Sequence, residues 1–186
     1  MGARAPTPSI VLGVAPGLTT ASFAVLAFSQ KFPPRVLDYD VLIGTRPSQL
    51  RKLGIPELEF ISSAVELAKR FKVHRMVIEV ICERHTPCLV AVGPAAKTKE
   101  PDPHVAGARM ALHAMAALFD LPVYDVSEQE LKGAFRGEKL QTAVQRRLLS
   151  PIGSSDRRVM IAAASAMVAA SIAPYNYPTQ PLHSVA

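Results

Sequence analysis

The sequence predicts an α/β domain: a mixed five-stranded sheet, made of a three-strand antiparallel meander plus two parallel strands, with helices on both faces. Three apolar segments with short connections open the chain, as is typical of a meander. Later strand-like segments alternate with helical ones, which favours strands parallel to the first. A chain of 186 residues, 49% hydrophobic and 19% charged, fits one such domain. We expect this domain at residues 9–173, between tails at 1–8 and 174–186.

The meander is predicted from three apolar runs. Ser9 to Val14 is continuously apolar, as expected of a central strand that is covered on both faces. Ala21 to Phe28 and Arg35 to Ile43 are the second and third strand candidates. Pro33 and Pro34 lie between these two candidates, and because proline cannot continue a ladder they predict a loop there.

The middle of the chain predicts helix, strand, loop, helix and strand. An amphipathic helix begins at Pro56, a residue suited to the first helical position, and ends near Lys72. Residues 75–81 form a continuous strand pattern that only Glu79 interrupts. Residues 91–103 carry loop signals, and an Ala- and Met-rich helix at 105–119 and a short strand at 122–126 follow.

Helices are expected after that strand. Ser127 and Glu130 have the spacing of a capping box, and a second helix should run from Glu138 to about Leu149. Ser-Ser-Asp at 154–156 precedes the last helix, whose apolar run at 159–173 is shorter than the ~20 residues that a bilayer requires. This run therefore predicts a core helix, and we expect no membrane partner. An intracellular, cytoplasmic location is expected by default, with an organelle left open.

The charge and the aromatic content limit the classes of partner. A net charge of +6 favours an anionic partner, of which nucleic acid is the most common. Aromatic residues make up only 6% of the chain, so a broad base-stacking platform is not expected.

The two cysteines raise the alternative of a metal site. Cys82, His85 and Cys88 form a Cys-x-x-His-x-x-Cys run that offers three ligands, whereas structural zinc takes four at different spacings. We therefore favour two reduced cysteines near the end of a strand, as in an intracellular protein.

Five blocks between Ser9 and Ala173 share their order and spacing with a known family. They are VLGVAPGLTTASFAV, MVIEV, AGARMALHAMA, LPVYDVSEQELKGAFRGEKLQTAVQRRLL and SSDRRVMIAAASAM. In this order they resemble the RuvC-type Holliday junction resolvases of the ribonuclease-H-like superfamily, which act in DNA recombination. The resemblance implies a ribonuclease-H-like sheet and a homodimer that binds nucleic acid.

The resemblance also implies where catalytic residues would stand. Nucleases of this kind gather carboxylates at the tip of the first strand, at the end of the fourth strand and in the last helix, where they hold two magnesium ions. The blocks place Ala15, Glu79, and then Asp156 and Val159 at these four positions. Only Glu79 and Asp156 retain oxygen ligands, so Mg²⁺ binding should be weak or absent and DNA cleavage is not expected. An active form would require Mg²⁺.

Each of these positions has an alternative explanation. Ala15 is either a laboratory Asp-to-Ala change or natural decay, and Val159 favours decay because one engineered change would not remove two acids. Asp156 is either a remnant ligand or a helix N-cap. A buried Glu79 is either a remnant ligand or the partner of an arginine.

Basic residues surround the expected site. Lys132 and Lys139 match lysines that the family places near the scissile phosphate. Arginines on the same helices add charge suited to phosphate, although a solvated helix face is an equal alternative. The family's aromatic wedge is replaced by Cys82, and the loop between the two lysines is shorter. The expected nucleic-acid-binding residues are Lys132, Arg136, Lys139, Arg146, Arg147, Arg157 and Arg158.

Three functions remain open from the sequence. The first is a catalytically degenerate RuvC-like protein, a pseudo-nuclease, that binds branched DNA or structured RNA without cleaving it. The second is an active crossover junction endodeoxyribonuclease seen as an inactivated variant. The third is a structural or assembly component of a larger nucleoprotein complex. The helix at 105–119 corresponds to the family's homodimer interface, and its small residues would permit close approach between helices: Ala106, Gly107, Ala108, Ala111 and Ala114.

Overall fold

The computed structural model describes residues 9–17, 20–43, 75, 78–94, 103–136 and 138–172. Three consecutive strands, β1 (Ser9–Pro16), β2 (Thr20–Phe28) and β3 (Arg35–Ile43), form the expected antiparallel meander. The helix expected at residues 56–72 lies outside the described residues.

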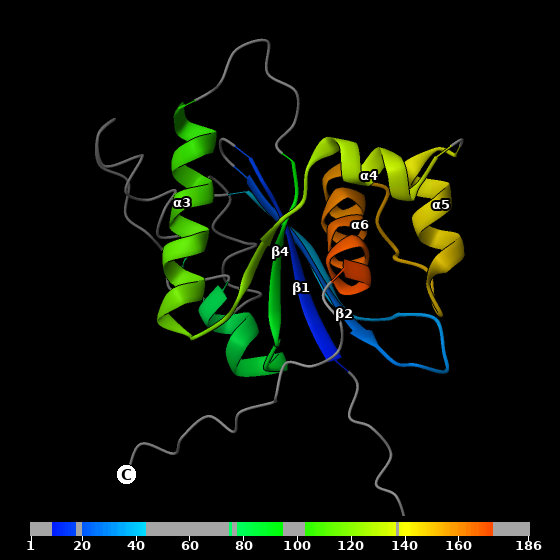
Figure 1. The fold of residues 1–186 in the computed structure, drawn as a ribbon, viewed down its shortest axis with the longest axis horizontal. Helices are drawn as coiled ribbons and strands as arrows, with labels where there is room; N and C mark the ends of the chain where they lie inside the picture. Colours follow the sequence, from blue (N-terminus) through cyan, green and yellow to red (C-terminus); the bar gives the residue numbers. More distant parts are fainter. Residues whose placement is uncertain are drawn as a thin grey trace, which may run out of the picture.

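Two parallel strands complete a sheet with the order β3-β2-β1-β4-β5. β4 (Leu89–Val92) pairs with β1 in parallel, and β5 (Val123–Asp125) pairs with β4 in parallel. The predicted mixed five-stranded sheet is therefore confirmed, with β1 at its centre (Figure 1).

The position of the fourth strand differs from the prediction. Residues 78–85 are helical, so the strand expected at 75–81 is wrong, and the real strand begins at Leu89 inside the following apolar run. Ile78, Ile81 and Cys82 are spaced by three and four residues and are buried together, which is a helical pattern. A short apolar run rich in β-branched residues does not distinguish a strand from a buried helix, and here packing decides.

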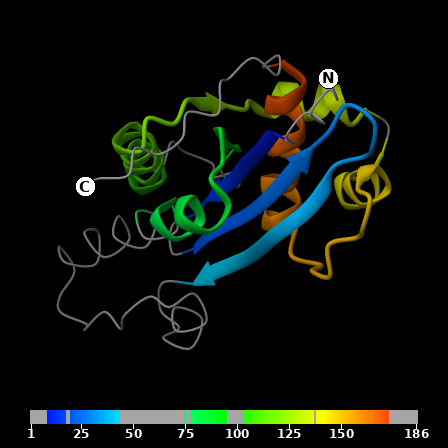
Figure 2. The ribbon, with the colours of Figure 1, turned by 90° about the horizontal axis from the view of Figure 1, so that it is seen from below.

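The sheet separates two layers of helices. On one face, α6 (Arg157–Ile172) crosses β1 and β2, and α4 (Glu128–Ala134) and α5 (Leu140–Arg147) pack outside it. On the other face lie the 78–85 helix and α3 (Pro103–Leu118). Figure 2 shows the strands between these two groups.

The helix α6 is the buried core helix that the sequence predicts. It has 16 residues, and nine of them, mostly alanine and valine, are buried. Within the described part of the chain, no helix combines the length and the apolar character that crossing a bilayer requires.

Glycine at position 13 lets α6 lie very close to the sheet. A Cβ added at Gly13 would fall on the carbonyl oxygen of Ala162 and lie 3.2 Å from the Cβ of Ala166. Neighbouring positions facing the same helix are the alanines Ala15, Ala24 and Ala91. The backbone of α6 therefore contacts the backbone of β1 almost directly.

The outer strand β3 carries two carboxylates that bind its own backbone. Asp38 Oδ1 accepts a hydrogen bond from the N–H of Tyr39 at 2.9 Å, and Asp40 Oδ1 accepts one from the N–H of Val41 at 2.7 Å. Two main-chain donors of this edge strand are thus occupied by side chains.

The close approach of α6 predicts a large penalty for a single methyl group. We expect Gly13→Ala to lower the free energy of unfolding by about 3 kcal/mol, because the added carbon meets a backbone oxygen that can move only with the helix. Gly133→Ala is the matched control: it lies in α4 with no atom within 4 Å of the added carbon, and should stabilise by about 0.5–1 kcal/mol. Urea denaturation followed by circular dichroism measures both, and a Gly13→Ala variant as stable as the parent would contradict the packing.

Candidate functional site

The end of β1 meets the first turn of α6 through apolar side chains. Ala15, in the position expected for the first-strand aspartate, is 4% exposed, and Val159 in the first turn of α6 is fully buried. Both belong to the same apolar layer between the sheet and α6. Both positions thus face the α6 side of the sheet, and neither offers an oxygen.

The end of β4 offers no carboxylate either. After Val92 the chain continues with Gly93, whose N–H donates to the carbonyl of Val14 at 2.8 Å. A Cβ added at Gly93 would lie 2.5 Å from Ser165 Oγ and 3.1 Å from Ile161 Cγ2, both on α6. A side chain at this position would therefore collide with the helix, and no glutamate fits where the fourth strand ends.

Glu79 does not lie at the tip of a strand. It belongs to the 78–85 helix, whose Ile78 and Ile81 pack with Leu12 and Val14 on the face of the sheet opposite to α6. Its carboxylate accepts a hydrogen bond from Arg75 Nε at 2.7 Å, one helical turn away. The arginine pairing left open by the sequence is thus observed, and Glu79 and Asp156 are not brought together.

Asp156 caps α6. Its Oδ1 accepts from the backbone N–H of Arg158 at 2.8 Å, and its Oδ2 pairs with Arg158 Nη2 at 2.7 Å. The hydrogen bond from the Arg158 side chain, assisted by the backbone N–H and the positive charge of that residue, lowers the pKa of Asp156. This geometry corresponds to the N-cap alternative, and the carboxylate is engaged by the first turn of its own helix.

The residues at the four expected ligand positions do not fit a two-magnesium site. Magnesium takes oxygen ligands, whereas Ala15 and Val159 offer a methyl and an isopropyl group. Of the two remaining carboxylates, Glu79 lies in the 78–85 helix and Asp156 is bound by Arg158. Among the residues described, no group of three His, Cys, Asp or Glu side chains could hold a metal ion.

His85 and Cys88 of the Cys-x-x-His-x-x-Cys run contact residues of the sheet. His85 Nε2 lies 3.3 Å from Asp38 Oδ2 on β3, and Cys88 Sγ donates to the carbonyl of Ile10 at 3.2 Å. Burial raises the pKa of the Cys82 thiol to about 12, which leaves it protonated, and both cysteines are free thiols.

One polar atom remains unsatisfied beside Ala15. Ser22 pairs with Ala15 across the β1–β2 ladder, so both side chains face α6. The Ser22 hydroxyl is fully buried and has no hydrogen-bond partner in the described structure. A buried hydroxyl without a partner is costly, and here it lies in an otherwise apolar layer.

The helix α4 is fixed to β5 by the predicted capping box. Ser127 Oγ accepts from the N–H of Glu130 at 3.2 Å, and the Glu130 carboxylate accepts from the Ser127 N–H at 2.7 Å and from Tyr124 Oη at 2.5 Å. Hydrogen bonds from Ser127, then from Tyr124, lower the pKa of Glu130 to about 2. The contribution of Glu130 to stability is present above its ordinary pKa and is lost as the pH falls toward 2. Glu130 thus orients the start of the basic surface.

The basic surface is formed by α4, α5 and the start of α6. Lys132 pairs with Glu128 at 3.0 Å and Arg146 with Glu138 at 2.7 Å. Arg147 stacks over the Phe135 ring, 4.4 Å from its centroid, and donates to the carbonyl of Ala134. Three exposed cations have no ion-pair partner within the described ranges: Arg136, Lys139 and Arg157. Between residues 127 and 158 there are seven basic and four acidic side chains, so this stretch carries half of the net charge of +6.

A further charged cluster at the ends of β4 and β5 was not predicted. Arg109 donates to the carbonyl of Gly93 at 3.0 Å and to Asp125 Oδ1 at 2.5 Å, while His113 Nε2 lies 2.9 Å from Asp125 Oδ2. The spacing of Arg109 and His113, four residues apart on a helix, was a usable signal, and so was Asp125 at the end of a strand. Their meeting depends on the β4–β5 pairing, which only the structure provides.

The fold and its tip define a class of protein, the α/β domains of ribonuclease-H-like architecture. Among solved structures, the chain is similar to RuvC of Thermus thermophilus in complex with Holliday junction substrate, with a TM-score of 0.64 and 20% identity over 86% of this chain and 91% of that one. RuvC of the same organism, in a structure of its own, gives 0.64 and 21% over 86% and 92%. The yeast mitochondrial Holliday junction resolvase Ydc2 gives 0.61 and 14% over 90% and 78%.

The chain therefore has the RuvC-like fold, and the comparisons confirm the resemblance found in its sequence as a resemblance of fold. No protein-family model and no curated protein matches the chain.

The apolar contact at the tip of β1 predicts the effect of restoring its acid. Ala15→Asp places a carboxyl group in the buried layer under α6, where Ser22 offers a single hydroxyl donor. We expect a loss on the order of 3–5 kcal/mol at neutral pH, since the buried charge stays unpaired. Burial raises the pKa of the introduced carboxyl group above its unfolded value near ~4, so the loss grows as the pH rises from about 4 to 8.

Urea denaturation across this pH range measures that loss, and Ala15→Asn serves as the control that cannot ionise. The Asn variant should show no such added pH dependence. A rise in Tm of the Ala15→Asp variant on addition of Mg²⁺ or Mn²⁺ would contradict the prediction, because it would reveal a metal held at the tip of the sheet.

Proposed function

We propose that this chain is a RuvC-like nucleic-acid-binding protein that binds branched DNA or structured RNA without cleaving it. The observation that carries the proposal is the contrast between two neighbouring regions. The tip of β1 and β4 presents apolar and backbone atoms to α6, whereas α4 and α5 beside it keep exposed cations such as Arg136 and Lys139. The surface that would hold phosphates is present without the groups that would hold magnesium.

The comparison supports the choice of ligand. One of the similar structures is that of RuvC bound to Holliday junction substrate, and this chain spans 91% of that protein. Phosphate contacts supply most of the affinity of such complexes, and they come from Lys and Arg side chains on an exposed face. The positions of Lys132 and Lys139, on α4 and at the start of α5, suit this role.

The rival proposal of an active nuclease seen as an Asp-to-Ala variant has less support. Restoring an acid at Ala15 alone would leave Val159 buried and Gly93 without room for a side chain. Mg²⁺ would be the cofactor of such an activity. A nicked product from the Ala15→Asp variant in Mg²⁺ or Mn²⁺ would favour this rival.

Removing two of the free cations should weaken binding in a characteristic way. We expect the double variant Arg136→Gln/Lys139→Gln to bind a four-way junction more weakly and to reduce the slope of log K against log salt by about two, one for each lost phosphate contact. The control Arg75→Gln removes one positive charge from the opposite face, where Arg75 pairs with Glu79, and should leave the slope unchanged. Fluorescence anisotropy measures the slopes at salt concentrations between about 50 and 200 mM, the range in which salt strongly weakens phosphate contacts. Equal slopes in all three proteins would contradict the proposed surface.

We also propose that α3 forms a homodimer. Met110 is 73% exposed and Leu118 is 74% exposed. Both lie on the outward face of α3, where they alternate with Ala106 and Ala114 at four-residue spacing. Large apolar side chains with this exposure are suited to a second copy of the same helix, because small neighbours allow close approach. This dimer would also suit an assembly role within a larger nucleoprotein complex.

A charge in the centre of this stripe should separate the copies. We expect Met110→Lys to shift the protein from dimer to monomer in light scattering coupled to size exclusion, since two lysines would face each other across the axis. Leu149→Lys alters an equally apolar residue, 56% exposed, away from α3 and should leave the mass unchanged. A parent protein that is monomeric throughout the micromolar range would contradict the dimer.

A further inference from the structure

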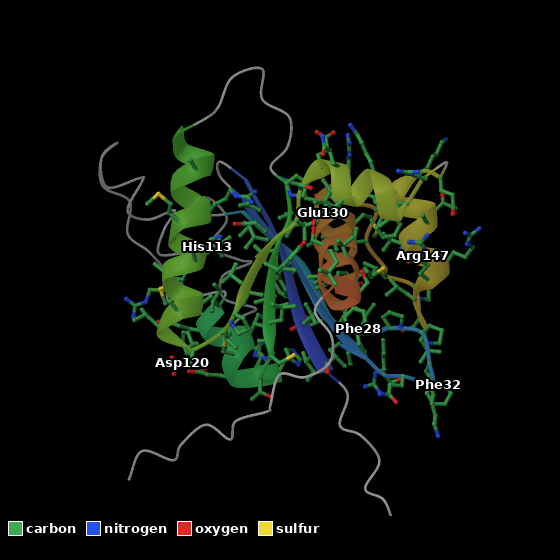
Figure 3. All side chains as sticks on the ribbon, in the orientation of Figure 1. Phe28, Phe32, His113, Asp120, Glu130 and Arg147 are labelled. Carbon is green, nitrogen blue, oxygen red and sulfur yellow. The ribbon has the colours of Figure 1, made fainter. Side chains whose placement is uncertain are left out.

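The β2–β3 hairpin ends in an exposed aromatic residue. Phe32 is 66% exposed, the largest value for an aromatic side chain among the residues described, and it projects from the edge of the molecule below α5 (Figure 3). The neighbouring Phe28, four residues earlier, is buried in the core. A lone exposed phenylalanine needs no explanation, so its surroundings decide whether it has a use.

Local contacts restrict the conformation of the tip. The N–H of Phe32 donates to Ser29 Oγ at 3.1 Å, and Pro33 and Pro34 restrict the chain that follows. The carbonyl of Pro34 accepts a hydrogen bond from the N–H of Leu149 at 2.9 Å, which joins the hairpin to the segment after α5. A side chain presented by a fixed loop binds with a smaller loss of conformational entropy.

The charges around the tip are positive. Lys31 and Arg35 flank Phe32 on the hairpin, both are exposed, and neither has an ion-pair partner within the described ranges. Across the hydrogen bond from Leu149, the chain leads directly back to Arg146 and Arg147 at the end of α5. The tip therefore continues the basic surface of α4 and α5, and an anionic partner fits it better than a neutral apolar one.

The connection between α5 and the hairpin is short. The helix α5 ends at Arg147, and the N–H of Leu149, two residues later, donates to the carbonyl of Pro34 on the hairpin at 2.9 Å. A strand bound by its phosphates at the end of α5 would therefore lie next to the hairpin that carries Phe32.

We propose that the hairpin tip is a contact for an unpaired nucleotide, in which Phe32 stacks on the base while Lys31 and Arg35 hold the adjacent phosphates. This inference rests on the proposed binding of nucleic acid and makes it more specific: the preferred ligand has unpaired bases next to a duplex. Bases stacked in a duplex are not accessible to a protruding ring, whereas bases at a branch point or in a bulge are.

The experiment compares two DNA probes, a plain duplex and the same duplex carrying a three-nucleotide bulge with 2-aminopurine at its centre. We expect the parent protein to prefer the bulged probe and to quench the 2-aminopurine. Phe32→Ala should weaken binding to the bulged probe by roughly five- to 150-fold and abolish the quenching, with duplex binding unchanged. Phe32→Tyr keeps the ring and should behave as the parent. Ile172→Ala, which alters another exposed apolar side chain, is the control.

The outcomes separate the two proposals. If the parent binds both probes and Phe32→Ala binds them equally well, with the quenching intact, the tip is not a nucleotide contact and the proposed function stands. If the parent binds neither probe at low salt, both proposals fail. If Phe32→Ala instead changes the mass in solution, the tip is a protein contact and the inference is overturned.

Discussion

The structure depends on the contact between the backbone of α6 and the backbone of β1. Gly13 has no side chain, so the helix lies almost directly on the central strand, and the neighbouring alanines complete a thin apolar layer. This packing holds α6 against β1, β2 and β4. At the end of β4, Gly93 faces Ser165 and Ile161 of the same helix.

The charged side chains near the tip of the sheet lie at the surface of the domain. Asp156 and Glu130, two carboxylates near the tip, are both engaged in starting helices, through Arg158 and Ser127. These caps fix α6 and α4, and α4 in turn positions Phe135, over which Arg147 stacks. The cations are carried on short helices that pack on α6, so the rigidity of the core is transmitted to the surface that would contact an anionic partner.

Local signals in the sequence predicted much of the fold. The meander followed from continuous apolar runs, and the start of α4 followed from Ser127 and Glu130, because a capping box is formed within four residues. The fourth strand could not be predicted in the same way. The runs around Ile78 and Leu89 are both apolar and rich in branched residues. Successive residues from Leu89 to Val92 are buried on alternate faces of the sheet, whereas Ile78 and Ile81 are buried on one face, and this difference appears only in the packed structure.

The candidate site was predictable only where it is local. Asp156 as a cap needs nothing beyond its own helix, and Ala15 and Val159 both lie on the α6 side of the sheet. The placement of Glu79 depended on the fourth strand and failed with it. The cluster of Arg109 and Asp125 joins α3 to β5, two elements whose contact is set by the sheet order, which no short pattern reveals.

The aspartates of β3 limit how copies of this protein can meet. The strand lies at the edge of the sheet, and an incoming strand would need the main-chain donors of Tyr39 and Val41, which the carboxylates of Asp38 and Asp40 already occupy. Displacing them would expose two negative charges to the newcomer's carbonyl oxygens. The opposite edge, β5, has only three residues. Edge-to-edge pairing of copies through either border of the sheet is thereby disfavoured.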